Sequence, residues 1–295
     1  MDVQERIEEI LATMPADAGW ERRLALLGGA EKRERPAVAV HSAGVARSSH
    51  SLALAVGFSE AEAMEVMKAA LWHDIGKLAI PDEVLKKPGR LDDEEAAVMR
   101  KHARAGEALM GEDAPQMMRD VAVFHHERYD GYGYEGLKGE EIPLAARIVC
   151  ISDVHDALLQ AREYKKALPE EEVLAIMIND AESPGFGRRA FDPFLLRRFV
   201  AMRLQDPSLA VSTENREALE SFVKSNPMDD VPGGWEANDG WLVKPSGHRI
   251  LYGRAENGNR RMEEMRGPTG DLQFIARGPS AVAEAPYHAE DAPRM

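Results

Sequence analysis

The chain has 295 residues, 44% of them hydrophobic, and a formal net charge of −14 at pH 7. This length allows one large domain, or one domain with a small appendage, and the hydrophobic fraction is sufficient for a sizeable core. The strong negative charge argues against an extended nucleic acid as partner, because a phosphate backbone requires a basic surface.

Targeting signals are not evident along the chain. The first residues, MDVQERIEEI, do not combine a basic stretch with a following apolar one, so we expect no secretory signal. No apolar run approaches the ~20 residues that a membrane-spanning helix needs, which predicts no membrane partner. The single cysteine, Cys150, excludes an intramolecular disulfide framework. These features predict a cytoplasmic protein.

Helical patterns dominate most of the chain, because apolar residues recur at helical spacing. The expected helices are residues 2–14, 19–28, 38–56, 59–74, 93–110, 115–128, 143–159, 169–181, 192–204 and 213–225. The charged stretch EKRERP separates the second helix from the third. Two segments rich in Gly and Pro or Tyr interrupt the later helices: GKLAIPDEVLKKPGRLDDEE, with one short helix, and YDGYGYEGLKGEEIP, which we expect to be an ordered loop.

The composition changes after about residue 206, and Gly, Pro and Asn become frequent from Pro227. The pieces GWLVKP, HRILYGR and DLQFIAR are typical of short strands separated by turns. We expect a disordered tail from about residue 279. The strands suggest a small β unit that either covers a functional site or mediates formation of a homodimer.

The overall pattern predicts an all-α fold, a helical bundle with a small C-terminal extension that contains a few β-strands. We expect an N-terminal helical segment at residues 1–36, a main domain at 37–206 and the extension at 207–295.

Histidine and aspartate recur along the predicted helices in a way that indicates a metal site. Five of the nine histidines belong to this set. The seven candidate ligands are His41, His73, Asp74, His102, His125, His126 and Asp153. Imidazole and carboxylate bind transition metals, and seven ligands exceed what one ion takes. The set therefore predicts a centre of two divalent ions, which most often serves phosphoester hydrolysis.

The chemistry of the side chains suggests different roles within this set. A carboxylate has two oxygens and can bridge two metals, whereas an imidazole offers one nitrogen at a time, so Asp74 is the natural bridge. Lys77 lies three residues later on about the same helical face. An ammonium group beside two metals is reasonable only if an anion, such as a substrate phosphate, lies between them.

The sequence context of individual His and Asp residues indicates whether each one lies at the predicted site. Asp153 lies inside an apolar run, where an unpaired carboxylate would be costly. Asp156 shares its helical face and is a candidate for contact with a ligand side chain or with substrate. His50 and His155 point away from the predicted site. Considered alone, His41 is more typical of an ordinary core or surface position than of a metal ligand.

At HDIGK, HHERYDG and RIVCISDVHDALLQAREYK the sequence resembles the HD-GYP family of bacterial phosphodiesterases, within the HD metal-dependent phosphohydrolase superfamily. The likeness runs from about His41 to Phe199. The resemblance implies an HD-domain helical bundle that hydrolyses cyclic di-GMP to linear pGpG, with GMP as the product of a further cut. It also implies iron or manganese as the metal.

The resemblance assigns roles by position. It implies that one metal is bound by His41, His73, Asp74 and Asp153, and the second by Asp74, His102, His125 and His126. Asp74 and Lys77 would be the catalytic residues, with Lys77 also contacting phosphate. Arg162 and Lys165 would join Asp156 in substrate binding, which requires the preceding helix to end near Leu159.

Two positions depart from the family pattern. The signature loop reads Gly133-Tyr134-Glu135 where the family has Gly-Tyr-Pro, and this change bears on activity and on recognition of a signalling partner through the loop. Ala37 stands where some members carry a glutamate that supports a third metal, so we predict a binuclear centre.

Two alternatives to cyclic di-GMP hydrolysis remain open. The first is an HD-type hydrolase of another nucleotide, such as cyclic GMP-AMP. The second is a catalytically weak, metal-bound regulatory or ligand-binding protein. The altered loop and the unmatched C-terminal residues favour this alternative.

Overall fold

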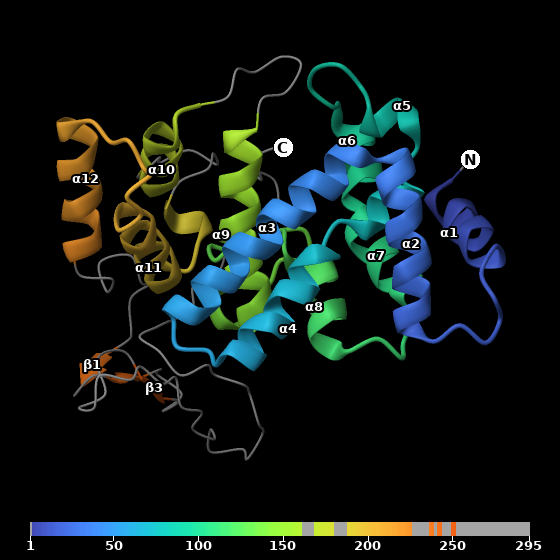
Figure 1. Ribbon diagram of the computed structural model, residues 1–295, viewed down its shortest axis with the longest axis horizontal. Coiled ribbons are helices and arrows are strands. Elements are labelled where there is room, and N and C mark those ends of the chain that lie inside the picture. Colours follow the sequence, from blue (N-terminus) through green and yellow to red (C-terminus); the bar gives the residue numbers. More distant parts are fainter. Residues whose placement is uncertain are drawn as a thin grey trace.

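A computed structural model describes residues 2–160, 168–179 and 188–225, together with three short strands between residues 236 and 251. The described helices form an all-α body, as predicted (Figure 1). Its α-helices are α1 (Val3–Ala12), α2 (Trp20–Glu34), α3 (Pro36–Ala55), α4 (Glu60–Leu71), α5 (Asp82–Leu85), α6 (Asp93–Arg100), α7 (His102–Met110), α8 (Gln116–Phe124), α9 (Leu144–Leu159), α10 (Glu170–Ile178), α11 (Pro193–Leu204) and α12 (Thr213–Lys224). Three 3₁₀ turns complete the set: η1 (Ile75–Ala79), η2 (Gly139–Glu141) and η3 (Arg188–Ala190).

The long helix α3 runs diagonally through the middle of the bundle (Figure 1). It packs against α4 and α9, and α8 in turn packs against α4 and α9. On one side α7 contacts η1 and α8, and on the other α10, α11 and α12 pack together. Completely buried apolar side chains such as Leu52, Ile148 and Phe199 fill the centre. This apolar packing is the main source of stability for helices of this length.

Helix α2 is longer than predicted, because it continues through EKRE to Glu34 instead of ending at residue 28. The charged stretch consists of good helix formers, and Glu31 within it faces the interior at 5% exposure. A charged sequence was therefore a misleading signal for a helix end.

Three predicted helices end early or divide. The helix predicted at 59–74 ends at Leu71, so His73 and Asp74 lie in the turn before η1. The helix predicted at 93–110 divides into α6 and α7 at Lys101. The helix predicted at 115–128 ends at Phe124, with His125 as its C-cap. Each break falls beside a candidate metal ligand.

The C-terminal strands are β1 (Glu236–Asn238), β2 (Trp241–Val243) and β3 (Arg249–Leu251), which form an antiparallel sheet in that order. β2 and β3 fall in GWLVKP and HRILYGR, so both predicted strands are confirmed. DLQFIAR and the predicted tail lie outside the described residues. The domain limits at residues 36 and 206 stay a prediction.

Within the described part of the chain, no helix has the length and apolar character that a bilayer span requires.

Candidate metal centre

The seven predicted ligand residues converge from five parts of the bundle. α3 carries His41, and the turn between α4 and η1 carries His73 and Asp74. The remaining residues come from the first turn of α7, the end of α8 and the middle of α9: His102, His125, His126 and Asp153. Side chains separated by more than a hundred positions in sequence thus meet in one place.

Three overlapping groups in this cluster have ligand atoms within 4.8 Å of one another. The groups are Asp74 with His102, His125 and His126; His41 with His73 and Asp74; and His73 with His125 and Asp153. Asp74 belongs to two of them, which is the arrangement expected of a bridging carboxylate.

Unsatisfied polar atoms at the centre of the cluster fit a bound cation. Asp74 Oδ1 and His73 Nε2 are buried, and neither has a hydrogen-bond partner. Buried polar atoms without a partner are costly, and a native protein normally satisfies them. The orphaned atoms and the His/Asp donor set together fit transition-metal ions.

Three of the imidazole rings are oriented by carbonyl oxygens of the helix that precedes each histidine. The Nδ1 atoms of His73 and His102 lie 2.8 Å and 2.7 Å from the carbonyl oxygens of Ala70 and Met99. His125 Nδ1 lies 3.0 Å from the carbonyl oxygen of Val121. A ring nitrogen facing a carbonyl must be the N–H donor, so in each ring Nε2 carries the lone pair toward the cluster.

His41 is held differently, by carboxylates at both ring nitrogens. Its Nε2 lies 2.8 Å from Asp153 Oδ1, and its Nδ1 lies 2.6 Å from Asp156 Oδ2. Asp156 also accepts a hydrogen bond from Gln160. The structure therefore places Asp156 behind His41, where a carboxylate fixes the orientation of a ligand ring.

Gly44 in α3 leaves the space in which Asp156 of α9 reaches His41. A Cβ atom at Gly44 would fall under 3.0 Å from the Asp156 carboxylate, a distance that real Cβ atoms essentially never show. A side chain at this position of α3 would displace Asp156 from His41.

A second glycine sets the distance between two parts of the cluster. A Cβ atom at Gly76 in η1 would fall under 3.0 Å from backbone atoms of His102 and Gly106 in α7. The backbone that follows Asp74 therefore lies directly against the backbone of α7, which carries His102.

Burial keeps the imidazoles of His102 and His125 neutral. It lowers the pKa of His102 to about 4 and that of His125 to about 3. Burial also acts to lower the pKa of His41, but hydrogen bonds to Asp153 and Asp156 outweigh it and raise that pKa to about 10. Burial alone would raise the pKa of Asp74, but Lys77 and His73 outweigh it and hold that pKa well below its usual range. Neutral imidazole beside ionised carboxylate is the protonation state that metal binding requires.

Lys77 lies at the open edge of the cluster. Its Nζ is 2.5 Å from Asp74 Oδ2, and its side chain is 21% exposed. It can therefore face a bound anion while it contacts Asp74.

Arg162 and Lys165 lie outside the described residues, although α9 does end at Leu159, as their predicted contact with substrate requires. His50 and His155 bond to Glu60 and Glu170 instead of joining the cluster, as predicted.

Glu31 is a residue at this site that the sequence analysis missed. Its buried carboxyl has a pKa raised to about 7, first by burial and then by the charge of Asp74. A close helix contact brings it there, because a Cβ at Gly28 would lie 2.5 Å from the Trp72 ring. Leu24, Leu27 and Glu31 share one helical face, and a glutamate on an apolar face was the signal available in the sequence.

Glu127 and Tyr134 also belong to the surroundings of the cluster. Glu127 is buried and accepts hydrogen bonds from the backbone N–H groups of Glu135 and Leu137, at 2.7 Å and 2.6 Å. The Tyr134 ring lies 4.6 Å from that of His126. The spacing of HHE and the tyrosine in the sequence does not indicate this contact.

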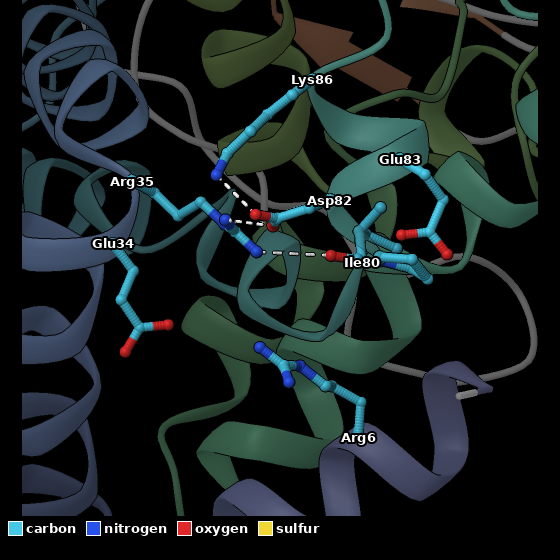
Figure 2. Close-up of a pocket in the computed structure, with 8 residues that line it drawn as sticks. Arg6, Glu34, Arg35, Ile80, Asp82, Glu83 and Lys86 are labelled. Atoms are coloured by element: carbon cyan, nitrogen blue, oxygen red, sulfur yellow. Dashed lines mark hydrogen bonds and ion pairs between the residues drawn. The ribbon is translucent and has the colours of Figure 1, made fainter.

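A separate cavity of about 470 Å³ lies between α1, the junction of α2 and α3, and α5. Figure 2 shows the Arg35 guanidinium reaching Asp82 and the carbonyl oxygen of Ile80. This cavity is lined by none of the seven candidate ligands. The buried Arg35 links the start of α3 to the segment that follows η1. α3 carries His41, and Asp74 directly precedes η1.

Residues 9–189 match the sequence model of the HD domain family, which is more than half of the chain. The cyclic di-GMP phosphodiesterase response regulator RpfG of Xanthomonas campestris pv. campestris (strain 8004) is 43% identical over 203 residues, covering 63% of this chain and 52% of that protein.

Two relatives come from Vibrio cholerae serotype O1 (strain ATCC 39315 / El Tor Inaba N16961). A cyclic di-GMP phosphodiesterase is 38% identical over 160 residues, covering 51% of this chain and 31% of that protein. The 3′3′-cGAMP-specific phosphodiesterase 2 is 40% identical over 152 residues, covering 50% of this chain and 29% of that protein. This chain thus spans about half the length of the first relative and about a third of the other two. The match to the family model, the order of the motifs and these relatives together show that the chain belongs to the HD domain family, in its HD-GYP branch.

Proposed function

We propose that this chain is a metal-dependent phosphodiesterase that hydrolyses cyclic di-GMP to linear pGpG, with GMP as the product of a second cut. The observation that carries the proposal is the pair of orphaned buried atoms, Asp74 Oδ1 and His73 Nε2, at the centre of the His/Asp cluster. The names of the relatives supply the reaction and the substrate class.

The cluster fits two divalent ions, and we propose iron or manganese. One ion would be held by His41, His73, Asp74 and Asp153, and the other by Asp74, His102, His125 and His126. Bound metal ions would lower the pKa of a water molecule and offset charge on the phosphoryl oxygens. His102 and His125 are suited to this role because burial keeps their imidazoles neutral.

The protein's own groups would bind and orient the substrate. Lys77 lies beside Asp74 with part of its side chain exposed, so its ammonium can pair with a phosphate oxygen. We propose the same role for Arg162 and Lys165, because two spaced cations suit a substrate with two phosphates. Asp156 would act on His41, to which it is hydrogen-bonded, in addition to any contact with substrate.

A second candidate substrate is 3′3′-cGAMP. The observation in its favour is the 40% identity to a phosphodiesterase named for that nucleotide. It contains the same two bridging phosphates, so the metal cluster would handle both compounds alike.

The proposal is tested by anaerobic purification, measurement of bound metals, and incubation with cyclic di-GMP or 3′3′-cGAMP while products are separated by chromatography. We expect about two metal ions per chain and release of a linear dinucleotide. Two metals without turnover of either nucleotide would instead indicate a regulatory or ligand-binding protein. A chain that retains no transition metal would refute the assignment of the cluster.

Homodimer formation and a signalling partner at the Gly133-Tyr134-Glu135 loop remain proposals. Light scattering of the purified chain tests the first, and a search for proteins that bind the wild type but not a loop variant tests the second.

A further inference from the structure

The loop at Gly133–Leu137 is here named the Tyr134 loop. Its glycines, and those that flank it, give its backbone more conformational freedom than other residues would. Gly136 has a φ of 77°, and the flanking Gly131 and Gly139 have φ of 89° and 52°. Glycine loses more conformational freedom on ordering than any other residue. The loop has no proline to restrict it, because Glu135 occupies the third position of the Gly-Tyr-Glu sequence. Its order must therefore come from contacts with the rest of the protein.

One set of contacts holds the loop from inside. The Glu127 carboxylate accepts the N–H groups of Glu135 at 2.7 Å and Leu137 at 2.6 Å. A Cβ at Gly133 would lie 2.5 Å from the Glu127 Cα atom, so the two chain segments are in close contact. These contacts fix the backbone of the loop, but they do not fix the side chain of Glu135, which points outward.

The side chain that the loop presents to the metal cluster is Tyr134. Its ring centroid is 4.6 Å from that of His126 and 6.3 Å from that of His102. The Arg100 guanidinium lies over the same ring at 5.8 Å. Tyr134 thus forms one wall beside two of the candidate metal ligands.

An arginine on α7 holds the loop from outside. Arg104 Nε lies 3.1 Å from Glu135 Oε1, and its terminal nitrogen lies 2.5 Å from Glu135 Oε2, which is a two-point ion pair. Glu107 fixes the same guanidinium at 3.2 Å. Paired N–H···O bonds from a planar guanidinium restrict orientation more than a single ion pair does. Arg104 lies two residues after His102, so α7 carries both a candidate ligand and this contact.

We propose that Arg104 is a positioning residue: its ion pair with Glu135 holds the Tyr134 loop, and with it the Tyr134 ring, against His126 and His102. The consequence for catalysis rests on the proposed function, whereas the consequence for the loop does not.

Hydrogen exchange measured by mass spectrometry on the metal-loaded full chain tests the effect on the loop. The two residues are substantially exposed, with side-chain exposures of 54% for Arg104 and 28% for Glu135, so neither substitution should unfold the protein. Exposed ion pairs contribute up to about 1 kcal/mol, so Arg104→Ala and Glu135→Gln should each accelerate exchange at residues 133–137 about two- to five-fold. The charge swap Arg104→Glu with Glu135→Arg should restore most of the protection.

Lys68→Ala is the matched control, because Lys68 is 52% exposed and pairs with Glu65 on α4 at 2.6 Å. It should leave exchange in the loop unchanged. Raising the salt concentration should accelerate loop exchange in the wild type and much less in Arg104→Ala, since only the wild type has the pair to screen. Equal exchange in Arg104→Ala, Glu135→Gln and the wild type would overturn the proposal.

Turnover distinguishes a role at the site from a role in the loop alone. With bound metal unchanged, Arg104→Ala should lower kcat/KM for the cyclic dinucleotide about two- to five-fold. In a Tyr134→Ala background the same substitution should have no further effect, because the two residues act through one contact. An active enzyme whose kcat/KM does not respond to Arg104→Ala would exclude the role at the site. A wild type that hydrolyses neither dinucleotide would refute the proposed function while the exchange result still stands.

Discussion

At the scale of single residues, the cluster is ordered by two kinds of support. His73, His102 and His125 are each oriented by a carbonyl oxygen of the helix immediately before them, so their positions follow from local backbone structure. His41 depends instead on a carboxylate from another helix, Asp156. Substitutions at the centre of the cluster and behind it should therefore have effects of different size.

Asp74→Asn should abolish metal loading and turnover together. The carboxylate is buried, one of its oxygens is orphaned, and it belongs to two of the three potential ligand groups. We expect a loss of turnover of at least about a hundred-fold, equivalent to ~2.7 kcal/mol of transition-state stabilisation. Metal analysis and product chromatography on the same preparation measure both effects. His50→Ala is the control, and full activity of the Asp74 variant at unchanged metal content would contradict the ligand assignment.

Asp156→Ala should weaken metal binding without eliminating it. Loss of a carboxylate that orients a ligand ring typically costs about 10- to 100-fold in metal affinity. Asp156→Asn keeps an oxygen that can accept from His41 Nδ1, so its effect should be smaller. Titration of the stripped protein with Mn²⁺ gives the affinities. A loss as large in the Asn variant as in the Ala variant would show that charge, and not orientation of the ring, is what Asp156 supplies.

At the scale of elements, the helices come together at glycines and buried polar contacts that hydrophobic periodicity does not reveal. The existence of α3 and α12 could be predicted from apolar spacing, since each buries residues on one helical face, and α9 and α11 could be predicted as largely apolar helices that are buried on most sides. The division between α6 and α7 at Lys101 could not, because both sides of the break retain helical residues. The charged end of α2 was misjudged because only the folded structure shows that Glu31 faces inward.

Gly44→Ala tests the contact between α3 and α9. Alanine in a helix interior normally stabilises by roughly 0.5–1 kcal/mol relative to glycine. Here the added Cβ would collide with the Asp156 carboxylate, so we expect lower stability and weaker metal binding. Gly29→Ala in α2 is the matched control, because its nearest neighbour would be the Arg33 side chain at 3.5 Å. Urea denaturation of both variants should give opposite signs, and a stabilised Gly44 variant would contradict the predicted collision.

Glu170 should make the joint between α9, α10 and α11 sensitive to acid. Burial alone would raise the pKa of its carboxyl, but hydrogen bonds from His155 and Arg203 lower it from 4.5 to about 2. Because the pKa is lower in the folded state, the carboxylate stabilises the fold above about pH 4.5, and this contribution disappears as the pH falls toward 2.

Glu170→Gln should therefore lower the free energy of unfolding by about 1–3 kcal/mol at pH 7, with the difference from wild type shrinking below pH 4.5. Urea denaturation at a series of pH values measures it. The exposed neighbour Glu172→Gln should change stability by less than about 0.5 kcal/mol. A difference that does not vary with pH would mean that the charge of Glu170 is not the source of its effect.

At the scale of the whole molecule, the candidate metal centre lies inside the packed core, so metal binding and folding should be linked. The sequence allowed prediction of all seven members of the cluster, because His and Asp in apolar surroundings are distinctive. It did not indicate Glu127 or Tyr134 as neighbours, since their contacts depend on the path of a glycine-rich loop.

Removal of metal should lower the melting temperature. A ligand at about 100 times its Kd stabilises the native state by ~2.7 kcal/mol. For a protein of this size that corresponds to a shift of roughly 5–10 °C. Thermal denaturation of chelator-stripped and Mn²⁺-reconstituted protein measures it, and Ca²⁺, which prefers oxygen ligands, should restore much less. Identical melting temperatures for the two forms would argue against metal binding in the core, and the Asp74→Asn variant should show no shift.

The contact of Gly76 with α7 has a consequence for ion selection. The separation of Asp74 from His102 is set where two stretches of main chain touch, and no change of side-chain rotamer alters that contact. Ionic radius is then a property that such a centre can discriminate, because its two sides cannot close further around a smaller ion.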